Sequence, residues 1–420
     1  MIIYDILIYM MTCLYIIANP FIEYKVQIKG MNVSGGDIVL FIIFFMYVLK
    51  IIISKAARSR FVAGLVNFFT DYLSLFMFGL LLVMAVSVTY AAERGLAISE
   101  TFRFATYIIL FFIIKYEFNH SKYVKGFINS YIFSVTIMSI FGIYQYFTGF
   151  GLNKNFIKTD GFLGRPRITV SLDNANNFGA FLILAIFPII MLTLYEKSLK
   201  NKVFYGLLSA SLLCNIIFSY SRNAMLGFVI GIIVLAIIFS WRLIFPILIM
   251  GGVGFLIPQI GDRVREIGSS AENYTRLKLW KTAWYMIKEH PLFGVGNGNF
   301  VSYYDSYVAK YHELYIYYEY KRFPCHNSYL KIQSELGIPG SVLFIGILIA
   351  SLNKVKNIIS SVEDEFYRYF YIGFVCSMLA FLFMNLSDNL FFVPKTTACF
   401  WFVLAIGEAM MFGNKEKIFS

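Results

Sequence analysis

Long apolar runs alternate with short polar segments along almost the whole chain. Runs of about 20 apolar residues have the length that crosses the core of a bilayer as a helix. The pattern therefore predicts an all-α polytopic membrane protein with about twelve transmembrane helices. We expect these helices at residues 2–19, 37–54, 70–90, 102–115, 127–148, 178–195, 203–219, 223–240, 243–258, 327–352, 367–387 and 396–412.

One polar segment, residues 259–326, is much longer than the others and lies between the ninth and tenth expected helices. The chain is thus expected to divide into helices one to nine (1–258), a large loop (259–326) and helices ten to twelve (327–420). From Tyr274 to Glu289 in the loop, apolar residues recur every three or four positions among lysines and arginines. This spacing predicts an amphipathic helix that lies in the membrane interface.

The lysines and arginines of the short loops predict how the helices are oriented. Cytoplasmic loops carry an excess of these residues. Most of them fall in the cytoplasm if both termini are cytoplasmic, and the large loop then lies on the outer face. The outer segment 149–177 breaks the rule, because it holds the basic residues Lys154, Lys158, Arg165 and Arg167.

Composition agrees with a membrane protein and limits other classes. Hydrophobic residues make up 59% of the chain and charged residues 14%, against roughly 25% charged residues in soluble domains. The net charge of +12 could suit a nucleic acid, but the expected topology leaves no basic soluble domain to bind one. Positive charge on the outer face instead indicates an anionic ligand there. The cysteines show no pairing framework and no C-x-x-C pattern, and we expect no metal and no cofactor.

The segment HNSYLKIQSELGIPG, residues 326–340, stands where the large loop re-enters the tenth expected helix. It opens with His326-Asn327 and reaches Gly337 after nine further residues. Histidine is the side chain best matched to general-base catalysis near neutral pH. Interfacial histidines are also common as hydrogen-bonded structural residues, so position in the sequence leaves both interpretations open.

Four arginines on the expected outer face are candidates for binding an anion. Arg222 stands at the N-terminal end of the eighth expected helix, where free backbone N–H groups and the helix dipole favour negative charge. Arg276 lies on the amphipathic helix, and Arg165 and Arg167 lie in the polar segment before the sixth helix. Arginines from several loops can bind a diphosphate through paired hydrogen bonds. Each could equally be an exposed or interfacial surface charge.

Tyrosines crowd the end of the large loop, and those at 303, 307, 311, 315 and 318 are expected to share one helical face. They suit an interfacial aromatic belt or a platform for stacking sugar rings, for which Tyr311 and Tyr315 are the candidate contacts. Just before them, Gly294, Gly296 and Gly298 alternate. Without a preceding strand, these glycines indicate a tight turn with close backbone approach rather than a nucleotide-binding loop.

Four motifs follow one another along the chain: Arg222 with Leu226, Arg276 before Trp280, the segment PLFGVGNGNF, and His326-Asn327 with Gly337 and Gly340. With this order and the position of the large loop, the chain resembles the bacterial O-antigen ligase and O-antigen polymerase superfamily. These proteins are GT-C-like membrane glycosyltransferases. The resemblance extends from the fourth or fifth expected helix to the last.

The resemblance implies a metal-independent, inverting transfer of a glycan from undecaprenyl diphosphate to a sugar hydroxyl, on the outer face of the bacterial inner membrane. Arg222 and Arg276 would stabilise the diphosphate leaving group, and His326 would accept the proton of the attacking hydroxyl. Asn327 would orient the histidine ring or a sugar, with Arg165 and Arg167 as further anion contacts. The expected partners are the lipid-linked glycan, an acceptor glycan or lipid A core, membrane lipids and a chain-length regulator.

Polymerase and ligase share this donor and overlapping motifs, and the tyrosine-rich loop favours the polymerase, which handles an extended glycan. A twelve-helix transporter is a different class, with matched halves and ionisable residues inside the membrane. Here Arg103 is the only charge expected clearly inside the membrane. Replacement of His326 would leave lipid-linked donor unused on the outer face if the chain is a transferase, whereas a failed transporter would trap donor inside.

Overall fold

The computed structural model describes residues 2–23, 25–28, 31–152, 162–243, 271–316 and 322–419. Some of the expectations fall outside this part of the chain. They are almost all of the helix expected at 243–258, part of the large loop, and Lys154, Lys158, Tyr317, Tyr318 and Tyr320.

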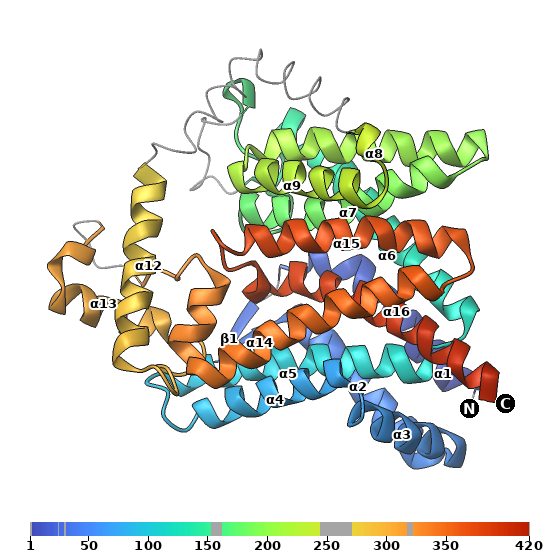
Figure 1. Cartoon of the computed structure of the whole chain (residues 1–420), viewed down its shortest axis with the longest axis horizontal. Coiled ribbons are helices and arrows are strands. Elements are labelled where there is room, and N and C mark those ends of the chain that lie inside the picture. Colours follow the sequence, from blue (N-terminus) through green and yellow to red (C-terminus); the bar gives the residue numbers. More distant parts are fainter. Residues whose placement is uncertain are drawn as a thin grey trace. The chain divides into compact units, whose positions relative to one another are not determined.

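Helices form nearly all of the described structure (Figure 1). The all-α class is confirmed, with one addition: residues expected in a loop form an antiparallel hairpin, β1 (Lys25–Ile28) with β2 (Met31–Ser34). The α-helices are α1 (Ile2–Ala18), α2 (Gly35–Ile53), α3 (Lys55–Phe68), α4 (Tyr72–Ser87), α5 (Arg94–Glu117), α6 (Ser121–Thr148), α7 (Ala175–Tyr195), α8 (Leu199–Ser219), α9 (Arg222–Ile238), α12 (Ala271–Glu289), α13 (Phe300–Lys310), α14 (Ser328–Ser361), α15 (Glu365–Met384) and α16 (Pro394–Phe419). Short 3-10 helices are η1 (Asn19–Phe21), η3 (Phe162–Gly164), η4 (Trp241–Leu243), η5 (His312–Leu314) and η6 (Leu390–Phe392).

Most of the described helices have the dimensions of membrane spans. Nine are long and apolar enough to cross a bilayer, or ten if α3 and α4, which meet at an 85° bend, count as one broken span. α9 is apolar but shorter, with 17 residues. A multi-pass membrane protein is thus confirmed, whereas the number of twelve spans stays a prediction.

α5 is longer than the sequence suggested. Expected at 102–115, it spans 24 residues. Its first turns carry Glu100 and Arg103, whose charges hide a helix from a hydropathy pattern. Arg103 lies 3.9 Å from Asp37 of α2, so its charge has an acidic neighbour on another helix.

The described helices pack into two compact units, each assembled from segments that are far apart in the sequence. The first contains Met1–Ile132, Thr275–Lys354 and Thr397–Ser420, and the second contains Phe133–Tyr274 and Val355–Thr396. The expected division into a large loop and two sets of spans refers to membrane topology and stays a prediction. In the first unit, α1 begins and α16 ends at one end, and α12 lies at the opposite end (Figure 1).

α7 is the buried centre of the second unit, with α8, α9 and α15 packed around it. α7 and α15 approach closely at Gly373, where a Cβ would lie 2.4 Å from the carbonyl oxygen of Phe187. Nearby, the Ser377 hydroxyl donates to the carbonyl of Ile183 over 2.8 Å. Small and hydroxyl-bearing residues are the usual contacts between membrane helices.

The first unit holds further charged side chains inside or beside its expected spans: Asp71, Lys115 and Glu408 fall within the expected ranges and are buried, and Lys354 follows one. Lys115 Nζ lies 3.3 Å from Asp71 and 2.8 Å from Glu408, and Lys354 Nζ lies 2.5 Å from Asp71 and 3.2 Å from Glu408. We call these residues the four-charge cluster. The expectation that Arg103 is the only charge inside a span is wrong. Each of these charges has a partner from another segment, which a hydropathy pattern cannot reveal.

Candidate functional site

The structure places the predicted site residues in both compact units. The first unit holds His326, Asn327, Arg276, Tyr311 and Tyr315, and the second holds Arg165, Arg167 and Arg222. Each group is described by itself.

His326 occupies a tightly specified backbone position at the junction of loop and helix. Its φ of 51° is in the left-handed region, which a residue with a side chain adopts only when its surroundings hold it there. The indole N–H of Trp280, on α12, donates to the His326 carbonyl over 3.1 Å. The residue is half-buried, so a fixed backbone holds a histidine that is partly exposed.

Asn327 is the N-cap of α14. Its Oδ1 accepts hydrogen bonds from the backbone N–H groups of Tyr329 and Leu330, each with a donor–acceptor distance of 3.0 Å. A side-chain cap of this kind contributes about 1 kcal/mol to a helix. Asn327 is therefore a structural anchor for the residue before it, and its expected contact with a sugar stays a prediction.

α14 is broken at Gly337, with nine residues between Asn327 and the break. Gly337, with φ 64° and ψ −159°, interrupts the helix, and Pro339 follows. In an unbroken helix the Glu335 carbonyl would accept from residue 339, but proline has no N–H to donate. The spacing between His-Asn and Gly-x-x-Gly therefore marks a separate first segment of α14, residues 328–336.

The glycine loop, residues 291–299, supplies the hydrogen bonds that the broken helix lacks. The amides of Val295 and Gly296 donate to the carbonyls of Ser334 and Glu335, each over 2.9 Å. Backbone groups freed by a break in a membrane helix need such partners, since lipid offers none. Amides of the glycine loop thus replace the N–H donors that a continuous helix would supply.

Gly294, Gly296 and Gly298 all have positive φ, between 66° and 101°. A Cβ at Gly294 would lie 2.3 Å from the backbone carbon of Glu335, and one at Gly337 would lie 2.1 Å from the carbonyl oxygen of Leu292. No side chain fits in either place. The prediction of a tight turn with close backbone approach is confirmed.

Three charged residues beneath this loop were not predicted from the sequence. Glu335, 1% exposed, accepts from the amide of Gly298 over 2.8 Å and from the amide of Phe300 over 3.0 Å. Lys331 pairs with Glu335 one turn away and with Glu100 of α5 over 3.1 Å. We call Glu100, Lys331 and Glu335 the glycine-loop cluster. Its sequence signal was a Lys-Glu pair spaced by four at the entry to an apolar span.

α12 confirms the predicted amphipathic helix, and the structure shows which of its faces packs against the protein. The residues buried against the protein are Leu279, Ala283 and Met286, whereas Leu277 and Trp284 are more than half exposed. The helix therefore has two apolar stripes, and spacing alone could not tell which one packs. α12 runs across the direction of α4, α5 and α14 (Figure 1), as an interfacial helix does when spans cross the membrane.

Arg276 lies on α12 one turn before Trp280, so the two side chains leave the same face of the helix. It is half-buried and forms no ion pair with a carboxylate in the described part of the chain. Through Trp280, the structure places this cation on the helix face that contacts the His326 backbone.

The tyrosines do not form the single helical face that was expected. α13 ends at Lys310, and Tyr311 has the non-helical angles φ −126° and ψ 88°, so that prediction is wrong. Tyr304 and Tyr307 are buried and pack against α12. Their side chains belong to the hydrophobic core between α12 and α13. The spacing of tyrosines in the sequence could not distinguish such a core from an exposed surface for sugar rings.

Tyr311 and Tyr315 are held by contacts within the loop. The Tyr311 ring stacks on Tyr285 with centroids 4.2 Å apart, and its hydroxyl donates to Glu289 over 3.0 Å. The Tyr315 carbonyl accepts from Lys278. The pKa of Glu289 is lowered to about 2, first by its hydrogen bond from Lys310 and then by one from Tyr307. Sugar binding by Tyr311 and Tyr315 stays a prediction.

In the second unit, Arg222 is the first residue of α9 and is buried. The preceding Ser221 caps the helix by accepting from the amide of Ala224 over 3.3 Å. A guanidinium at this position adds to the positive end of the helix dipole. An anion that reached this turn would therefore meet two sources of positive potential.

Arg167 lies beside the turn that carries Arg222. Its Nε donates to the carbonyl of Ser219 over 3.0 Å, and its Nη2 donates to Asn176 over 3.3 Å. Asn176 also accepts from Ser221 over 2.8 Å and donates to Asp388 over 3.2 Å. The structure thus brings Arg167 and the Arg222 turn together through Asn176, a residue that the sequence did not single out.

Arg165 is fixed at the end of α6. Its guanidinium donates to the carbonyls of Tyr146 and Phe147 over 3.1 and 3.2 Å and lies 5.2 Å above the Tyr146 ring. These contacts favour the structural interpretation of Arg165, and its binding of an anion stays a prediction.

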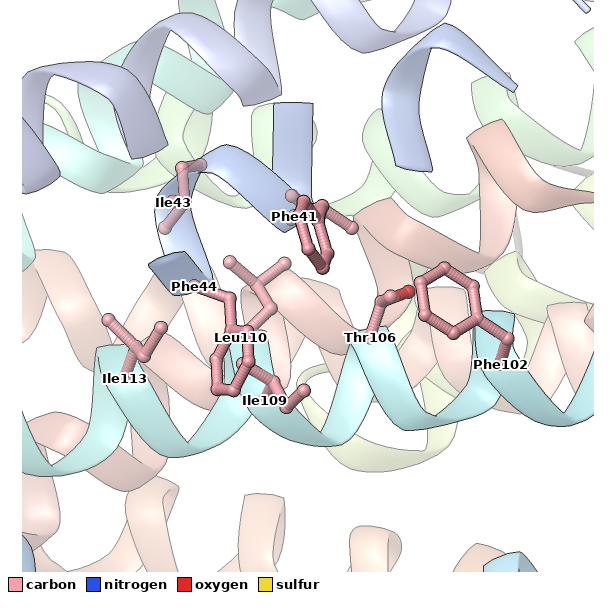
Figure 2. Close-up of a pocket in the computed structure, with 9 residues that line it drawn as sticks. Phe41, Ile43, Phe44, Phe102, Thr106, Ile109, Leu110 and Ile113 are labelled. Atoms are coloured by element: carbon pink, nitrogen blue, oxygen red, sulfur yellow. The ribbon is translucent and has the colours of Figure 1, made fainter. Parts of the chain in front are cut away.

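A small apolar cleft of about 70 Å³ lies between α2 and α5 (Figure 2). Side chains of both helices face one another across it, and its one polar lining residue is Thr106. The cleft suits hydrocarbon and offers nothing to a sugar or a diphosphate. Within the described ranges, no group of three or more histidine, cysteine or acidic side chains is arranged to hold a metal ion.

Comparison with known families identifies the central part of the chain. Residues 207–345 match the family model described as O-antigen ligase. The matched range contains Arg222, Arg276, the glycine loop and the segment from His326 to Gly340. No curated protein matches the chain significantly.

Proposed function

We propose that this chain is a member of the O-antigen ligase and polymerase superfamily, since the O-antigen ligase model matches residues 207–345, and that it transfers a glycan from undecaprenyl diphosphate to a sugar hydroxyl at the outer face of the bacterial inner membrane. The observation that carries the proposal is the setting of His326. Its backbone is fixed by Trp280 and by the capped start of α14, and the residue is partly exposed. Both fixed geometry and access are required of a general base.

In the proposed reaction, His326 accepts the proton of the acceptor hydroxyl. The acceptor oxygen bonds to the anomeric carbon while the bond from that carbon to the diphosphate oxygen breaks. The diphosphate leaves with the electron pair, and the configuration at the anomeric carbon inverts. The lipid carrier already activates the sugar, so this route needs no metal or cofactor from the protein.

Arg222 and Arg276 are proposed to stabilise the leaving diphosphate, where negative charge develops in the transition state. The helix N-terminus behind Arg222 and the absence of a described carboxylate partner at Arg276 support this role. Arg167, linked to the Arg222 turn through Asn176, is proposed as a further anion contact. Membrane lipids surround the enzyme, and a chain-length regulator is an expected partner.

The acceptor decides between two enzymes with the same donor. A polymerase adds a growing glycan to the next lipid-linked repeat unit, whereas a ligase adds the finished glycan to lipid A core. We favour the polymerase, because the tyrosine-rich loop suits an extended glycan. The ligase is the alternative.

The test uses purified protein in lipid vesicles with the undecaprenyl-diphosphate repeat unit as sole substrate. A ladder of glycan lengths indicates a polymerase. Consumption that requires added lipid A core indicates a ligase, and no consumption under either condition rejects the proposed function. His326→Ala is expected to abolish transfer. His312→Ala, which changes an exposed histidine of the same loop, is the matched control and is expected to keep it.

A further inference from the structure

The backbone of His326 belongs to a closed ring of contacts within the first unit. One arm runs from Asn327 through the first segment of α14 to Glu335. The other runs from the His326 carbonyl to Trp280 of α12. α12 packs against α13 through a buried cluster that includes Met286, Tyr304 and Cys325. Glu335 closes the ring where α13 meets the first segment of α14.

Glu335 forms hydrogen bonds to the glycine loop and α13 with both its backbone and its side chain. Its carbonyl accepts from the amide of Gly296, and its two carboxylate oxygens accept from the amides of Gly298 and Phe300. Phe300 is the first residue of α13. A carboxylate is favoured there, because it meets free N–H groups and the positive end of the helix dipole.

The charges around Glu335 explain why a neutral group cannot replace it. One ammonium, that of Lys331, is shared by the two carboxylates of Glu100 and Glu335. The backbone amides of the glycine loop supply the remaining positive potential. A glutamine at 335 would lose the charge, and its NH₂ group would meet an N–H donor at one of the two amide positions.

We propose that Glu335 is a positioning residue for glycan transfer: it locks the glycine loop and α13 onto the first segment of α14 and thereby fixes His326 for proton transfer. The inference rests on the proposed function of His326. It predicts that the effect of Glu335 falls on the chemical step, because a displacement of about 1 Å at a reacting group can cost about 100-fold in rate.

The first test compares Glu335→Gln with Glu408→Gln, a matched change of a buried glutamate in the four-charge cluster. Both variants are checked for a cooperative melt, and kcat and KM for donor and acceptor are measured for each. Glu335→Gln is expected to lower kcat by about 100-fold with little change in KM, while Glu408→Gln keeps the kcat of the folded protein. Equal losses in the two variants, or an unchanged kcat in Glu335→Gln, would overturn the proposal.

A second variant keeps the test decisive if Glu335→Gln folds poorly. Trp280→Phe removes the hydrogen bond to the His326 carbonyl and interrupts the same ring at another point. Trp280→Phe and Glu335→Asp are each expected to lower kcat. In the double variant the loss should be smaller than the two single losses combined, because both changes act on the same ring of contacts. Full additivity would contradict the proposal.

Hydrogen exchange separates failure of this inference from failure of the proposed function. Amides of residues 328–336 are expected to exchange faster in Glu335→Gln but not in Glu408→Gln, whether or not transfer is observed. Faster exchange in a protein without transfer activity would reject the proposed function and retain the positioning role. Unchanged exchange would reject the positioning role.

Discussion

The first unit contains two buried clusters of charged side chains, and their charges are stabilised by different partners. In the four-charge cluster, Asp71, Lys115, Lys354 and Glu408 balance one another, and every partner is a side chain. In the glycine-loop cluster, one lysine serves two carboxylates, and backbone amides supply the missing donors. The first cluster joins helices to one another, whereas the second joins a helix to a loop.

This difference indicates what each cluster contributes. Side-chain ion pairs between helices can be broken without changing the path of any loop, so the four-charge cluster is expected to affect stability alone. A carboxylate that binds loop amides determines where the loop lies. Because His326 lies directly before the capped start of the helix segment that carries Glu335, the glycine-loop cluster is expected to affect activity.

The largest effect is expected from closing the space between the glycine loop and α14. Gly337→Ala places a Cβ 2.1 Å from the carbonyl oxygen of Leu292 at a φ of 64°, so the loop must move away from the helix break. We expect loss of glycan transfer and of protease resistance in the loop. Gly206→Ala is the matched control, since the nearest atom to its Cβ is 3.7 Å away. Normal transfer by Gly337→Ala would contradict the close approach.

Next in size is the loss of a charge from the four-charge cluster. Lys115→Met leaves Asp71 and Glu408 with one cation between them, and breaking a buried ion pair costs about 3–5 kcal/mol. Denaturant unfolding in detergent should show that loss. Transfer per folded molecule should remain that of the unchanged protein, and a fall in kcat would remove the contrast between the clusters.

A smaller effect is expected at the cap of α14. Asn327→Ala should destabilise the first segment by about 1 kcal/mol and lower kcat. Asn327→Asp keeps an oxygen that can cap the helix and should preserve both properties. If the Asn327 amide instead donates to a sugar, the Asp variant will raise the KM of that substrate, which steady-state kinetics will show.

The smallest expected effect is a loss of stability of the large loop at acid pH. The pKa of Glu289 falls from 4.5 to about 2 in the folded protein, so its ionised form stabilises the loop above pH 4.5. That stabilisation is lost as the pH falls from 4.5 towards 2, and it is modest because the side chain is one-third exposed. Near-UV circular dichroism of the tyrosines should follow the loss, and Glu289→Gln should remove it. An equal transition in that variant would assign it to another group.

The resemblance to the O-antigen ligase and polymerase superfamily was evident from the sequence, because its motifs depend on residue types at short spacings. The glycine turn was predictable for the same reason, since only glycine tolerates the required angles. The packed face of α12 was not, because Leu277 and Leu279 are equally apolar and only their neighbours decide which is buried. The prediction of a single tyrosine face was wrong because the helical spacing of tyrosines continues past Lys310, whereas the helix ends there.

The sequence by itself determined a helical membrane protein, its resemblance to the O-antigen ligase and polymerase superfamily, and the tight glycine turn ahead of His326. These follow from local hydrophobicity and from backbone constraints at glycine and proline. Only the tertiary structure revealed the two charge clusters, the hub at Asn176 and the ring that holds His326. Their members lie far apart in the chain, with more than 200 residues between Glu100 and Lys331. A buried charge is stable only beside a partner that folding brings to it.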